Sequence, residues 1–592
     1  MGVLNTDAAM RLALSHFQAG RWAEGTAVCR EVLSAEPGHA GALHFLGVAA
    51  GNSGDADSAI ELIRKAIKSD PFVPEYHSNL SKYLHDRSRF AEAIAAARQA
   101  IQLQPGIAAA WGNLGHALHR SGKISEAADA FAQAAALAPE VAEFQRLAGS
   151  ELLSAGKTQA AVQFFRHLTR LAPEQQKGSA FYDLGVALAA DKQVDEAIAS
   201  YRQALQLNPR DEWAWNNLGN LYRQVGRLTE AVDALREATR LKPDWGEAYC
   251  NLGATLISQG EIESAAEVFG LALQKSPELP VIHYNHGVLL LLRGDYERGW
   301  SEYEWRWKCN EVHVPTKFDS PPWRGEPLEG KAILLHAEQG LGDTIQFARY
   351  APMVAERGGQ VFLCVQPELV GLLKNLPGVQ QIASLPSRLP PFQAHCYLMD
   401  LPLAFGTRVE SIPKTTPYLN PDPVLREKWA GKLATDTDLK VGLAWAGRPT
   451  HVSDHLRSMK LSQFAPLSEV PGITFYNLQK GAGSEQAIAP PTGMRWVDLI
   501  RDIDDLAETA SLISQLDLVI TVDSAVAHLA GALGKPVWIL TRFAPDWRWM
   551  LQRENSPWYP TARLFRQTAP GDWATVVERV RHELGVLART RL

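Results

Sequence analysis

The 592-residue sequence has little cysteine, no long apolar run and no strong excess of charge of either sign. Its five cysteines are scattered and lack metal-ligand spacing, so we expect buried thiols in a reducing cytoplasm rather than a disulfide framework or a zinc site. No stretch of the sequence approaches the ~20 apolar residues that a membrane span needs. The first residues carry no basic stretch before an apolar one, so we expect no secretory signal peptide.

The overall charge and composition are those of an ordinary globular protein. A net charge of −6 gives no reason to expect nucleic acid or an anionic membrane as a partner. Hydrophobic residues make up 46% of the chain and charged residues 21%. Because a chain of this length is too long for one core, we expect two or three domains. The expected location is the cytoplasm, as the scattered cysteines indicate.

What the sequence does contain is a motif repeated with a period of 34 residues. A proline closes each copy, and the spacing is 34 residues except for one gap of 36 between Pro173 and Pro209. Two small-residue positions keep the same register, as at Gly115 and Ala127, which close contact between paired helices requires. The period and these landmarks identify tetratricopeptide (TPR) repeats. The closing prolines are Pro37, Pro71, Pro105, Pro139, Pro173, Pro209, Pro243 and Pro277.

Each repeat is predicted to be a helical hairpin that cannot bury its own apolar face. Neighbouring hairpins therefore stack into an α-solenoid with a concave inner surface. We expect about nine repeats within residues 1–313. Their predicted starts lie near residues 6, 40, 74, 108, 142, 178, 212, 246 and 280.

An asparagine recurs two residues before the first small site of many repeats, with Asp183 in the repeat whose register is shifted. A carboxamide offers a donor and an acceptor, which can pair with a peptide group of an extended chain. The alternative is that these asparagines only cap or pack the helix pairs. The row resembles the asparagine ladder of the O-GlcNAc transferase TPR groove, which holds protein substrates in that family. The candidate acceptor-binding residues are Asn79, Asn113, Asn217, Asn251 and Asn285.

The repeats end in an aromatic run at residues 294–307, which we expect to dock the repeats onto the next domain. A proline-rich connector is predicted at residues 314–330. From Lys331 short apolar runs alternate with helical patterns, which is typical of a parallel α/β sheet. We expect two Rossmann-like lobes, at 331–420 and 421–592, joined by a hinge within 412–438 and closed by a C-terminal helix. This arrangement is typical of the GT-B architecture, whose ligand lies in the cleft between the lobes.

Ligands of open α/β sheets bind outside the carboxyl ends of the strands, so the turns that follow the strands are the candidate site. The first such turn carries Gly340, Gly342 and Asp343, although Asp343 is equally suited to cap a helix. The second is the segment 522–536, where a strand, a small polar turn and a helix follow one another. Free N–H groups at that helix start, together with the helix dipole, form a site for a diphosphate.

These two turns resemble those of the family 9 (ADP-heptose:lipopolysaccharide heptosyltransferase) glycosyltransferases. The resemblance rests on Leu341-Gly342-Asp343 and on Asp523-Ser524-Ala525 followed by His528-Leu529-Ala530. The whole chain is similar to bacterial TPR–glycosyltransferase fusions, among them flagellin-modifying enzymes. The resemblance implies that Asp343 is the general base. It also implies that backbone amides at Ser524 and Ala525 hold the donor diphosphate, with Asp523 and His528 beside them and Gly340 and Gly342 at the donor site.

The cation that binds phosphate is left open by the sequence. In the family a lysine precedes a Trp-Pro pair, which is missing here, so either Arg457 or Lys460 is the candidate, with Lys480 as a further one. A solvated surface role is the alternative for each. The Asp-x-Asp sequences at 436–438 and 502–504 are interpreted as caps or surface turns, so neither a metal nor a cofactor is expected.

The sequence thus predicts a metal-independent glycosyltransferase that moves a sugar from a nucleotide-sugar to a hydroxyl of a protein. The repeats hold the protein, for which the resemblance offers flagellin as an example. Two alternatives remain: a non-catalytic TPR adaptor with a degenerate nucleotide-sugar-binding domain, and an enzyme of glycan or lipopolysaccharide assembly.

Overall fold

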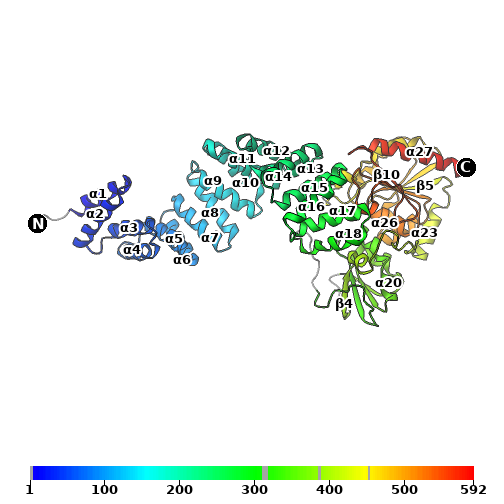
Figure 1. Ribbon diagram of the computed structural model, residues 1–592, viewed down its shortest axis with the longest axis horizontal. Coiled ribbons are helices and arrows are strands. Elements are labelled where there is room, and N and C mark those ends of the chain that lie inside the picture. The colour runs from blue at the N-terminus through cyan, green and yellow to red at the C-terminus, as the bar shows by residue number, and fades with distance from the viewer. Residues whose placement is uncertain (1–4, 310–317, 385–388, 451–453, 592) are drawn as a thin grey trace. The chain divides into compact units, whose positions relative to one another are not determined.

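The computed structural model describes residues 5–309, 318–384, 389–450 and 454–591. The chain divides into two compact units, Met1–Gln224 and Val225–Leu592 (Figure 1). The division falls inside the repeats, whereas the repeat pattern predicts a domain boundary at residue 313. The domain boundaries that we predict at residues 313, 330 and 420 rest on changes of sequence pattern, and they remain predictions.

The first unit consists, in its described residues, of antiparallel helix pairs. The first helices of the repeats begin at the predicted positions, for example at Ala40, Pro74 and Ala108. α11 differs, because it begins at Glu174, directly after Pro173, and so precedes the expected start near 178. The helices are α1 Thr6–Gln18, α2 Trp22–Ala35, α3 Ala40–Asn52, α4 Ala56–Ser69, α5 Pro74–Asp86, α6 Phe90–Leu103, α7 Ala108–Arg120, α8 Ile124–Leu137, α9 Ala142–Ser154, α10 Thr158–Leu171, α11 Glu174–Ala190, α12 Val194–Leu207 and α13 Glu212–Gln224.

The small-residue sites are where the paired helices touch. A Cβ added to Gly115 would lie 2.7 Å from the ring of Phe131, and one added to Gly185 would lie 2.7 Å from the ring of Tyr201. In each case the aromatic ring comes from the second helix of the same repeat. The second small site is fully buried, as at Ala127. The predicted close contact between the helices of a repeat is therefore confirmed.

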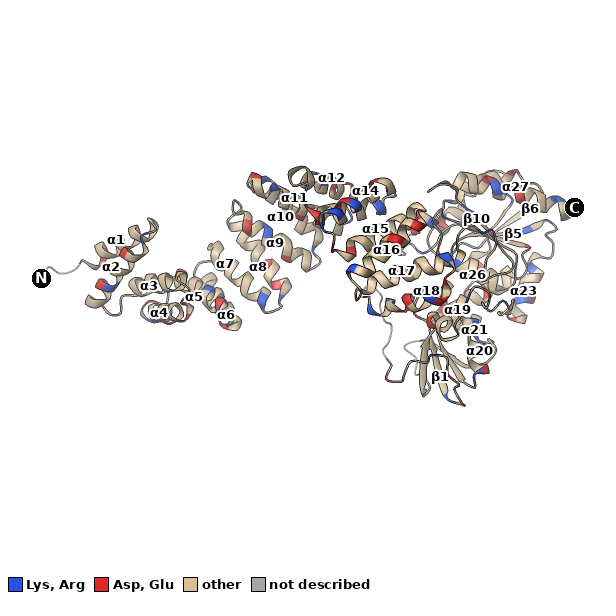
Figure 2. Cartoon of the chain, in the orientation of Figure 1, with Lys and Arg blue, Asp and Glu red and all other residues tan. Residues whose placement is uncertain are grey.

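Successive second helices in the first unit are also joined at their surface by ion pairs. Arg98 contacts Glu126 at 2.9 Å and Lys157 contacts Asp129 at 2.8 Å, each pair 28 residues apart. Figure 2 colours the basic residues of these helices blue and the acidic residues red. Because such exposed pairs contribute only about 0–1 kcal/mol each, the buried apolar contacts hold the repeats together.

The second unit contains the last repeat helices and two parallel sheets. The first sheet has the strand order β3-β2-β1-β4 and the second β10-β9-β8-β5-β6-β7. The repeat helices are α14 Leu228–Leu241, α15 Gly246–Gln259, α16 Ile262–Lys275, α17 Pro280–Arg293 and α18 Tyr296–Tyr303, followed by the 3₁₀ helix η1 Glu304–Lys308. Around the first sheet lie β1 Ala332–His336, α19 Leu341–Ala348, α20 Ala351–Glu356, β2 Gln360–Cys364, α21 Pro367–Leu373, β3 Val379–Ala383, β4 Ala394–Tyr397 and α22 Leu401–Ala404. Around the second lie α23 Pro423–Leu433, β5 Leu439–Ala444, α24 Asp454–Arg457, β6 Ile473–Asn477, β7 Trp496–Val497, α25 Leu506–Ile513, β8 Leu518–Val522, α26 Ala525–Ala532, β9 Val537–Thr541, η6 Trp547–Trp549, β10 Ala562–Arg566 and α27 Trp573–Arg591.

The parallel α/β fold is confirmed, with two corrections. The apolar run 396–401 predicts a strand throughout, but β4 ends at Tyr397 and Leu398–Asp400 forms a 3₁₀ turn. The stretch 412–438, predicted as a hinge, contains α23, whose Trp429 is fully buried. A buried tryptophan on a helix anchors that segment to the core, so most of it is not a free hinge.

The last repeats pack directly against the sheets within the second unit. The Trp300 indole donates a hydrogen bond to the Thr407 carbonyl at 3.0 Å, and its ring meets Trp547 edge-on at 5.2 Å between centroids. The predicted docking role of the aromatic run is therefore confirmed. None of the helices in the described part of the chain is long and apolar enough to cross a membrane.

Candidate functional site

The glycine turn after β1 positions Asp343 in the first turn of α19. The Gly340 N–H donates to Asp343 Oδ2 at 2.9 Å, so the carboxylate folds back over the turn and caps the helix. A Cβ on Gly340 would lie 3.1 Å from that oxygen, which explains the glycine. The Asp343 side chain still keeps 22% of its surface exposed. It is therefore both a helix cap and an accessible carboxylate at the end of a strand.

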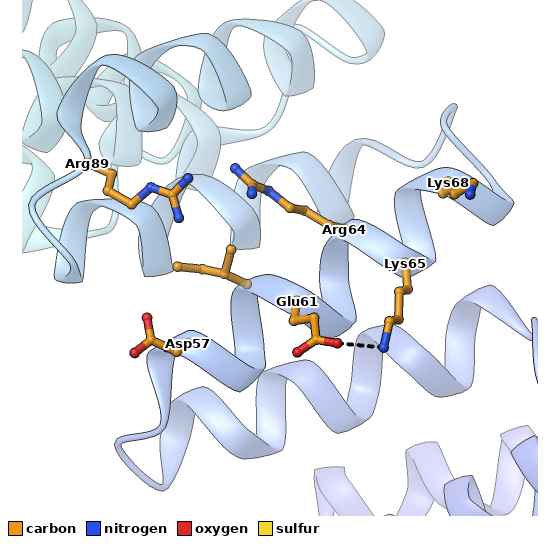
Figure 3. A pocket seen from close by; sticks show the side chains of 7 residues that line it. Asp57, Glu61, Arg64, Lys65, Lys68 and Arg89 are labelled. Carbon is orange, nitrogen blue, oxygen red and sulfur yellow. Dashed lines mark hydrogen bonds and ion pairs between the residues drawn. The ribbon is translucent and has the colours of Figure 1, made fainter.

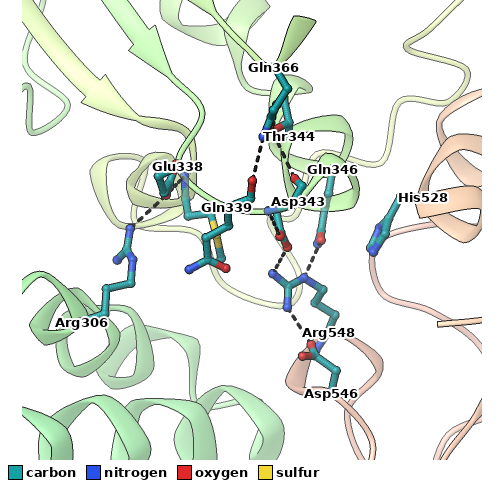
Figure 4. Close-up of polar contacts among 12 residues, drawn as sticks. Arg306, Glu338, Gln339, Asp343, Thr344, Gln346, Gln366, His528, Asp546 and Arg548 are labelled. Atoms are coloured by element: carbon teal, nitrogen blue, oxygen red, sulfur yellow. Dashed lines mark hydrogen bonds and ion pairs between the residues drawn. The ribbon is translucent and has the colours of Figure 1, made fainter. Parts of the chain in front are cut away.

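A buried arginine holds the other oxygen of Asp343. Arg548 Nη2 donates to Asp343 Oδ1 at 2.5 Å, and Arg548 Nη1 donates to Asp546 Oδ1 at 2.8 Å. Its Nε donates to Gln346 Oε1 at 2.8 Å (Figure 4). Burial alone lowers the pKa of Arg548, but the Asp546 and Asp343 carboxylates raise it above its ordinary value. This guanidinium stays charged and joins the turn after β1 to the loop after β9.

The second predicted turn forms the start of α26. Ser524 is the N-cap residue, but its hydroxyl contacts Thr521 Oγ1 at 3.0 Å instead of capping the helix. Within the described residues, the N–H groups of Ala525 and Val526 have no hydrogen-bond partner. These amides are thus available to an anion at the carboxyl end of β8.

Gly342 brings the two turns together. A Cβ added there would lie 2.8 Å from Cδ2 of His528 and 3.5 Å from Cα of Ala525. Because α19 and α26 approach this closely, Asp343 and the start of α26 lie beside each other and line the same site. The juxtaposition of the two motifs follows from the structure, whereas the donor contacts of Gly340 and Gly342 stay a prediction.

His528 is a packing residue in this arrangement. Its ring is 5% exposed, stacks on Trp549 at 5.5 Å, and its Nδ1 contacts the Tyr559 hydroxyl at 2.9 Å. Burial, with Arg548 nearby, lowers the pKa of His528 to about 3, so the ring is neutral. These contacts explain the histidine without a ligand, and a direct donor contact stays a prediction.

Asp523 and Asp546 form a pair of carboxyl groups with different protonation preferences. Burial raises the pKa of Asp523 and the Asp546 charge adds to this, while Arg457 and Arg548 oppose it. Burial also acts on Asp546, but Arg548 overcomes it and lowers the pKa of Asp546. Asp546 is therefore the ionised partner of Arg548, and Asp523 holds a proton more readily.

The three candidate lysine and arginine residues lie in different surroundings. The Arg457 guanidinium lies against Gly447, where a Cβ would be 2.8 Å from its Nη2, and its Nε contacts Asp454 at 3.1 Å. Lys460 is exposed. Lys480 Nζ donates to the carbonyls of Ile503 and Asp504 at 3.0 and 3.3 Å. Arg457 is thus the candidate whose charge reaches Asp523, and Lys480 has structural contacts.

A second buried network lies beside the glycine turn. Arg306, from η1, is 1% exposed and donates through Nη2 to Asp400 Oδ1 at 2.6 Å and to Glu338 Oε1 at 3.2 Å. The Met399 N–H donates to the same Glu338 oxygen at 3.1 Å. Burial raises the pKa of Glu338 to about 8, against the pull of Arg306. Because Asp400 is the closer carboxylate, it supplies the counter-charge and Glu338 is the protonated partner.

Sequence reasoning missed Asp546, Arg548, Glu338 and Arg542. Arg542 directly follows β9, and the run Asp546-Trp547-Arg548-Trp549 comes a few residues later. Charged residues between aromatic ones, a few residues after a buried strand, were the signal that could have pointed to Asp546 and Arg548. Glu338 likewise lies two residues beyond β1.

The asparagines of the repeats join consecutive repeats through their amide nitrogens. In the first unit, Asn79 Nδ2 contacts His44 Nε2 at 2.9 Å and Asn113 Nδ2 donates to the Ser78 carbonyl at 2.9 Å. Asn217 Nδ2 contacts the Tyr182 hydroxyl at 3.4 Å. Each partner lies 35 residues earlier in the chain. In the second unit Asn285 contacts Cys250 Sγ at 3.4 Å with the same offset, and Asn251 is also engaged. The packing alternative therefore has direct support, and a bound peptide is expected to meet the amide oxygens.

The Asp-x-Asp sequences make structural contacts. Asp436 accepts from the Tyr476 hydroxyl at 2.6 Å, Asp438 from Arg495 at 2.5 Å, and Asp502 from Lys432 at 2.7 Å. Over the described ranges, no group of three or more His, Cys, Asp or Glu side chains is arranged to hold a metal ion.

Two pockets lie away from Asp343. One of about 410 Å³ in the first unit is lined by residues that include Arg64, Lys65 and Glu61, and Lys65 is already paired with Glu61 (Figure 3). The other, of about 210 Å³ in the second unit, is lined by aromatic residues such as Trp307 and Tyr397 and by Asp400. The second pocket therefore shares Asp400 with the Arg306 network.

Comparison with known families supports both halves of the prediction. Residues 46–108, 79–142, 113–176 and 246–278 match tetratricopeptide repeat families, and residues 185–226 and 219–257 match a TPR repeat family. Residues 486–545 match glycosyltransferase family 9 (heptosyltransferase), a stretch that contains the start of α26. The chain thus contains tetratricopeptide repeats and, in its second half, a segment that matches glycosyltransferase family 9.

The chain is also similar to individual proteins. Protein FlbA from Caulobacter vibrioides is 31% identical over 313 residues, which cover 48% of this chain and 51% of FlbA. The chain thus spans about half the length of this relative. Among solved structures, Pseudomonas aeruginosa PilF is 22% identical, with 34% of this chain and 92% of PilF covered and a TM-score of 0.31. YrrB, a TPR protein with an unusual peptide-binding site, is 24% identical, with 32% and 95% covered and a TM-score of 0.27.

Proposed function

We propose that this chain transfers a sugar from a nucleotide-sugar to a hydroxyl group of a protein that its repeats hold. The observation that carries the proposal is the contact of Gly342 with His528 and Ala525. Because of this contact, the accessible Asp343 carboxylate and the free amides at the start of α26 lie in one site, at the carboxyl ends of strands from the two parallel sheets. Transfer of a sugar needs both a base for the acceptor and an anion site for the leaving group.

Asp343 is the general base in this proposal. A carboxylate offers about four acceptor directions, and the contacts with Gly340 and Arg548 occupy two of them. The remaining lone pairs are able to accept the proton of an acceptor hydroxyl as that oxygen attacks the sugar carbon. Arg548 keeps the carboxylate oriented, which general base catalysis requires.

The donor diphosphate binds at the start of α26. The Ala525 and Val526 amides and the helix dipole face the leaving group, and Arg457, which is paired with Asp454, lies nearby as a cation. These groups stabilise the charge that develops as the sugar bond breaks, so the proposal needs no metal ion. The two lobes act as the halves of a GT-B enzyme with the donor between them.

The acceptor is a protein segment bound by the repeats, and flagellin is the example that the family resemblance offers. Tethering raises the local concentration of the acceptor hydroxyl near Asp343. Enzymes of glycan assembly would need no such groove, and a degenerate adaptor would need no accessible carboxylate at the helix start. We place the reaction in the cytoplasm.

The test is a transfer assay with the full-length chain, a panel of nucleotide-sugars and proteins captured on the repeats from source cells that lack the enzyme. Intact-mass analysis reads the added sugar, and nucleotide release is measured in parallel. A mass increase of one sugar on a captured protein, with stoichiometric nucleotide release, supports the proposal. Nucleotide binding without transfer to any captured protein would favour the adaptor, and transfer to a glycan alone would favour glycan assembly.

A further inference from the structure

The segment after β9 packs between the last repeat helices and the α/β part of the second unit. Trp547, the first residue of η6, is 3% exposed. Its ring meets Trp300 of α18 edge-on at 5.2 Å between centroids and lies 6.1 Å from the ring of Tyr303 on the same helix. It also stacks with Phe347 of α19 at 6.5 Å. Trp547 therefore connects the last repeat helix to the helix that carries Asp343.

The same segment touches the turns that end two other repeat helices. A Cβ added to Gly260, the C-cap of α15, would lie 2.8 Å from the ring of Phe543. One added to Gly294, the C-cap of α17, would lie 2.7 Å from Cε of Met550. The segment between these two contacts thus rests on the repeat helices at both ends as well as at its centre.

Arg548 follows Trp547 in the chain and packs on its ring. The Arg548 guanidinium lies 4.3 Å from the centroid of that ring. A cation–π contact of this kind holds the plane of a guanidinium group against the ring. The nitrogens of the group then reach Asp343, Gln346 and Asp546. A shift of the Trp547 ring would therefore move the group that orients the Asp343 carboxylate.

The last repeat helix also lies close to the charges of the site. Tyr303, on α18, is 3% exposed. Burial raises the pKa of its hydroxyl, and the charges that act on it include Arg548, which opposes the shift, and Asp343, which adds to it. The repeat helices thus reach the charged groups of the site and not only the apolar surface around them.

We propose that Trp547 is a positioning residue, through which the last repeat holds Arg548, and thereby the Asp343 carboxylate, in the reactive geometry. The repeats then complete the catalytic site in addition to binding the acceptor. A movement of α18 relative to α19 changes turnover and leaves nucleotide affinity unchanged, because the free amides belong to a different helix, α26. This inference rests on the proposed function and adds a positioning residue to the same site.

Transfer kinetics of full-length Trp547→Phe test the inference, with the donor and acceptor that support transfer by the parent protein. Binding of UDP, GDP and ADP is measured by calorimetry on the same preparation. Phenylalanine keeps an aromatic ring but is too small to fill the space between α18 and α19. We expect turnover per nucleotide-binding site to fall about 10-fold, with the KM for the donor and the nucleotide affinity unchanged. The calorimetric stoichiometry counts the folded molecules, so a smaller folded fraction does not imitate this effect.

Two comparisons show whether Trp547 acts through Arg548. In a double-mutant cycle, adding Trp547→Phe to Arg548→Gln should lower turnover little further, because the group that Trp547 positions is already absent. Trp573→Phe is the matched control, since Trp573 of α27 is 7% exposed and packs in a different apolar core from Trp547. It is expected to lower the melting temperature and to leave turnover per site unchanged.

The outcomes separate this inference from the proposed function. Parent turnover per site in Trp547→Phe overturns the inference, as do independent, multiplying effects of the two changes in the cycle or an equal loss in Trp573→Phe. If the parent protein transfers no sugar, the proposed function is wrong and this inference falls with it. If Trp547→Phe does not fold, Trp300→Phe repeats the test from the repeat side, with the same expected loss and the same contradicting results.

Discussion

The Asp343 carboxylate and the Arg548 guanidinium lie 2.5 Å apart, although 205 residues separate them in the chain. The first belongs to the turn after β1 and the second to the loop after β9, so the contact ties the ends of the two sheets together. Arg548 is 9% exposed and also holds Asp546. Removing it leaves two carboxylates without their partner in a partly buried place.

Arg548→Gln is expected to lower the turnover number by about 10²-fold or more, because Asp343 loses the contact that orients it. Loss of one partner from a buried ion pair costs on the order of 3 kcal/mol, so the melting temperature also falls. Arg548→Lys keeps the charge and is expected to recover part of both. Steady-state kinetics and thermal unfolding of the three proteins are the measurements. Turnover in Arg548→Gln equal to that of the parent, at matched stability, would remove Arg548 from the account.

Glu338→Gln is expected to be tolerated, whereas Asp400→Asn is not. Glu338 has a pKa raised from 4.5 to about 8 in the folded chain. A raised pKa contributes stability that is fully present below pH 4.5 and is lost as the pH rises towards 8. Glu338→Gln should therefore flatten the fall in stability over this range, and should be the more stable protein at pH 8.

Thermal unfolding between pH 5 and 8 measures this difference, with Asp400→Asn as the contrast. That variant removes the counter-charge of Arg306 and is expected to destabilise the fold at every pH. If Glu338→Gln unfolds at a lower temperature than the parent throughout, Glu338 is ionised and our assignment of the two carboxyl groups is reversed.

Asp183 gives the first unit its own pH dependence. Burial raises its pKa from 3.8 to about 6, with Arg146 opposing and Asp211 adding to the shift. The stability linked to this group is present below pH 3.8 and is lost as the pH rises through about 6. Asp183→Asn should abolish that loss and stabilise the first unit at pH 7. Hydrogen exchange of α11, measured at pH 5 and at pH 7, tests this expectation. The exposed Asp195→Asn is the control, and equal behaviour of the two variants would refute the assignment.

A fragment that begins at Val225 should fold, whereas one that begins at residue 325 should not. Tyr296, Trp300 and Tyr303 are 1 to 3% exposed and pack against Trp547. Deleting them uncovers a large apolar surface on the α/β part, which favours aggregation. Soluble yield and circular dichroism of fragments 225–592 and 325–592 decide the matter. A soluble, cooperatively folded 325–592 fragment would show that the last repeats are dispensable.

The helices and most strands could be predicted because their signals are local. The period of 34 places the starts of α3, α5 and α7, and the apolar run 518–522 is the strand β8 itself. The strands β3 and β10 were not predicted, because polar residues such as Gln380, Gln381 and Arg563 interrupt their apolar pattern. Their place in the sheets is set by pairing with β2 and β9, which the strand sequences alone do not reveal.

The candidate site was predictable only where one short motif carries it. The turns at Asp343 and Ser524 have such motifs, whereas the pairing of Asp343 with Arg548 depends on how two sheets pack. The asparagines show the same limit. Their regular spacing was visible, but the donation of Asn113 to the repeat before it follows from the stacking of helices. A sequence pattern places a side chain on a face, and only packing decides what that side chain contacts.

The most direct test of the central claim is transfer by Asp343→Asn, with nucleotide affinity measured on the same preparation. Asparagine keeps the shape of the side chain and an oxygen for the Gly340 N–H, but it does not accept a proton as a base. We expect transfer to fall by about 10²- to 10⁴-fold with nucleotide affinity unchanged, while Asp438→Asn transfers normally. Undiminished transfer by Asp343→Asn would contradict the account, because the carboxylate would then play no part in the reaction.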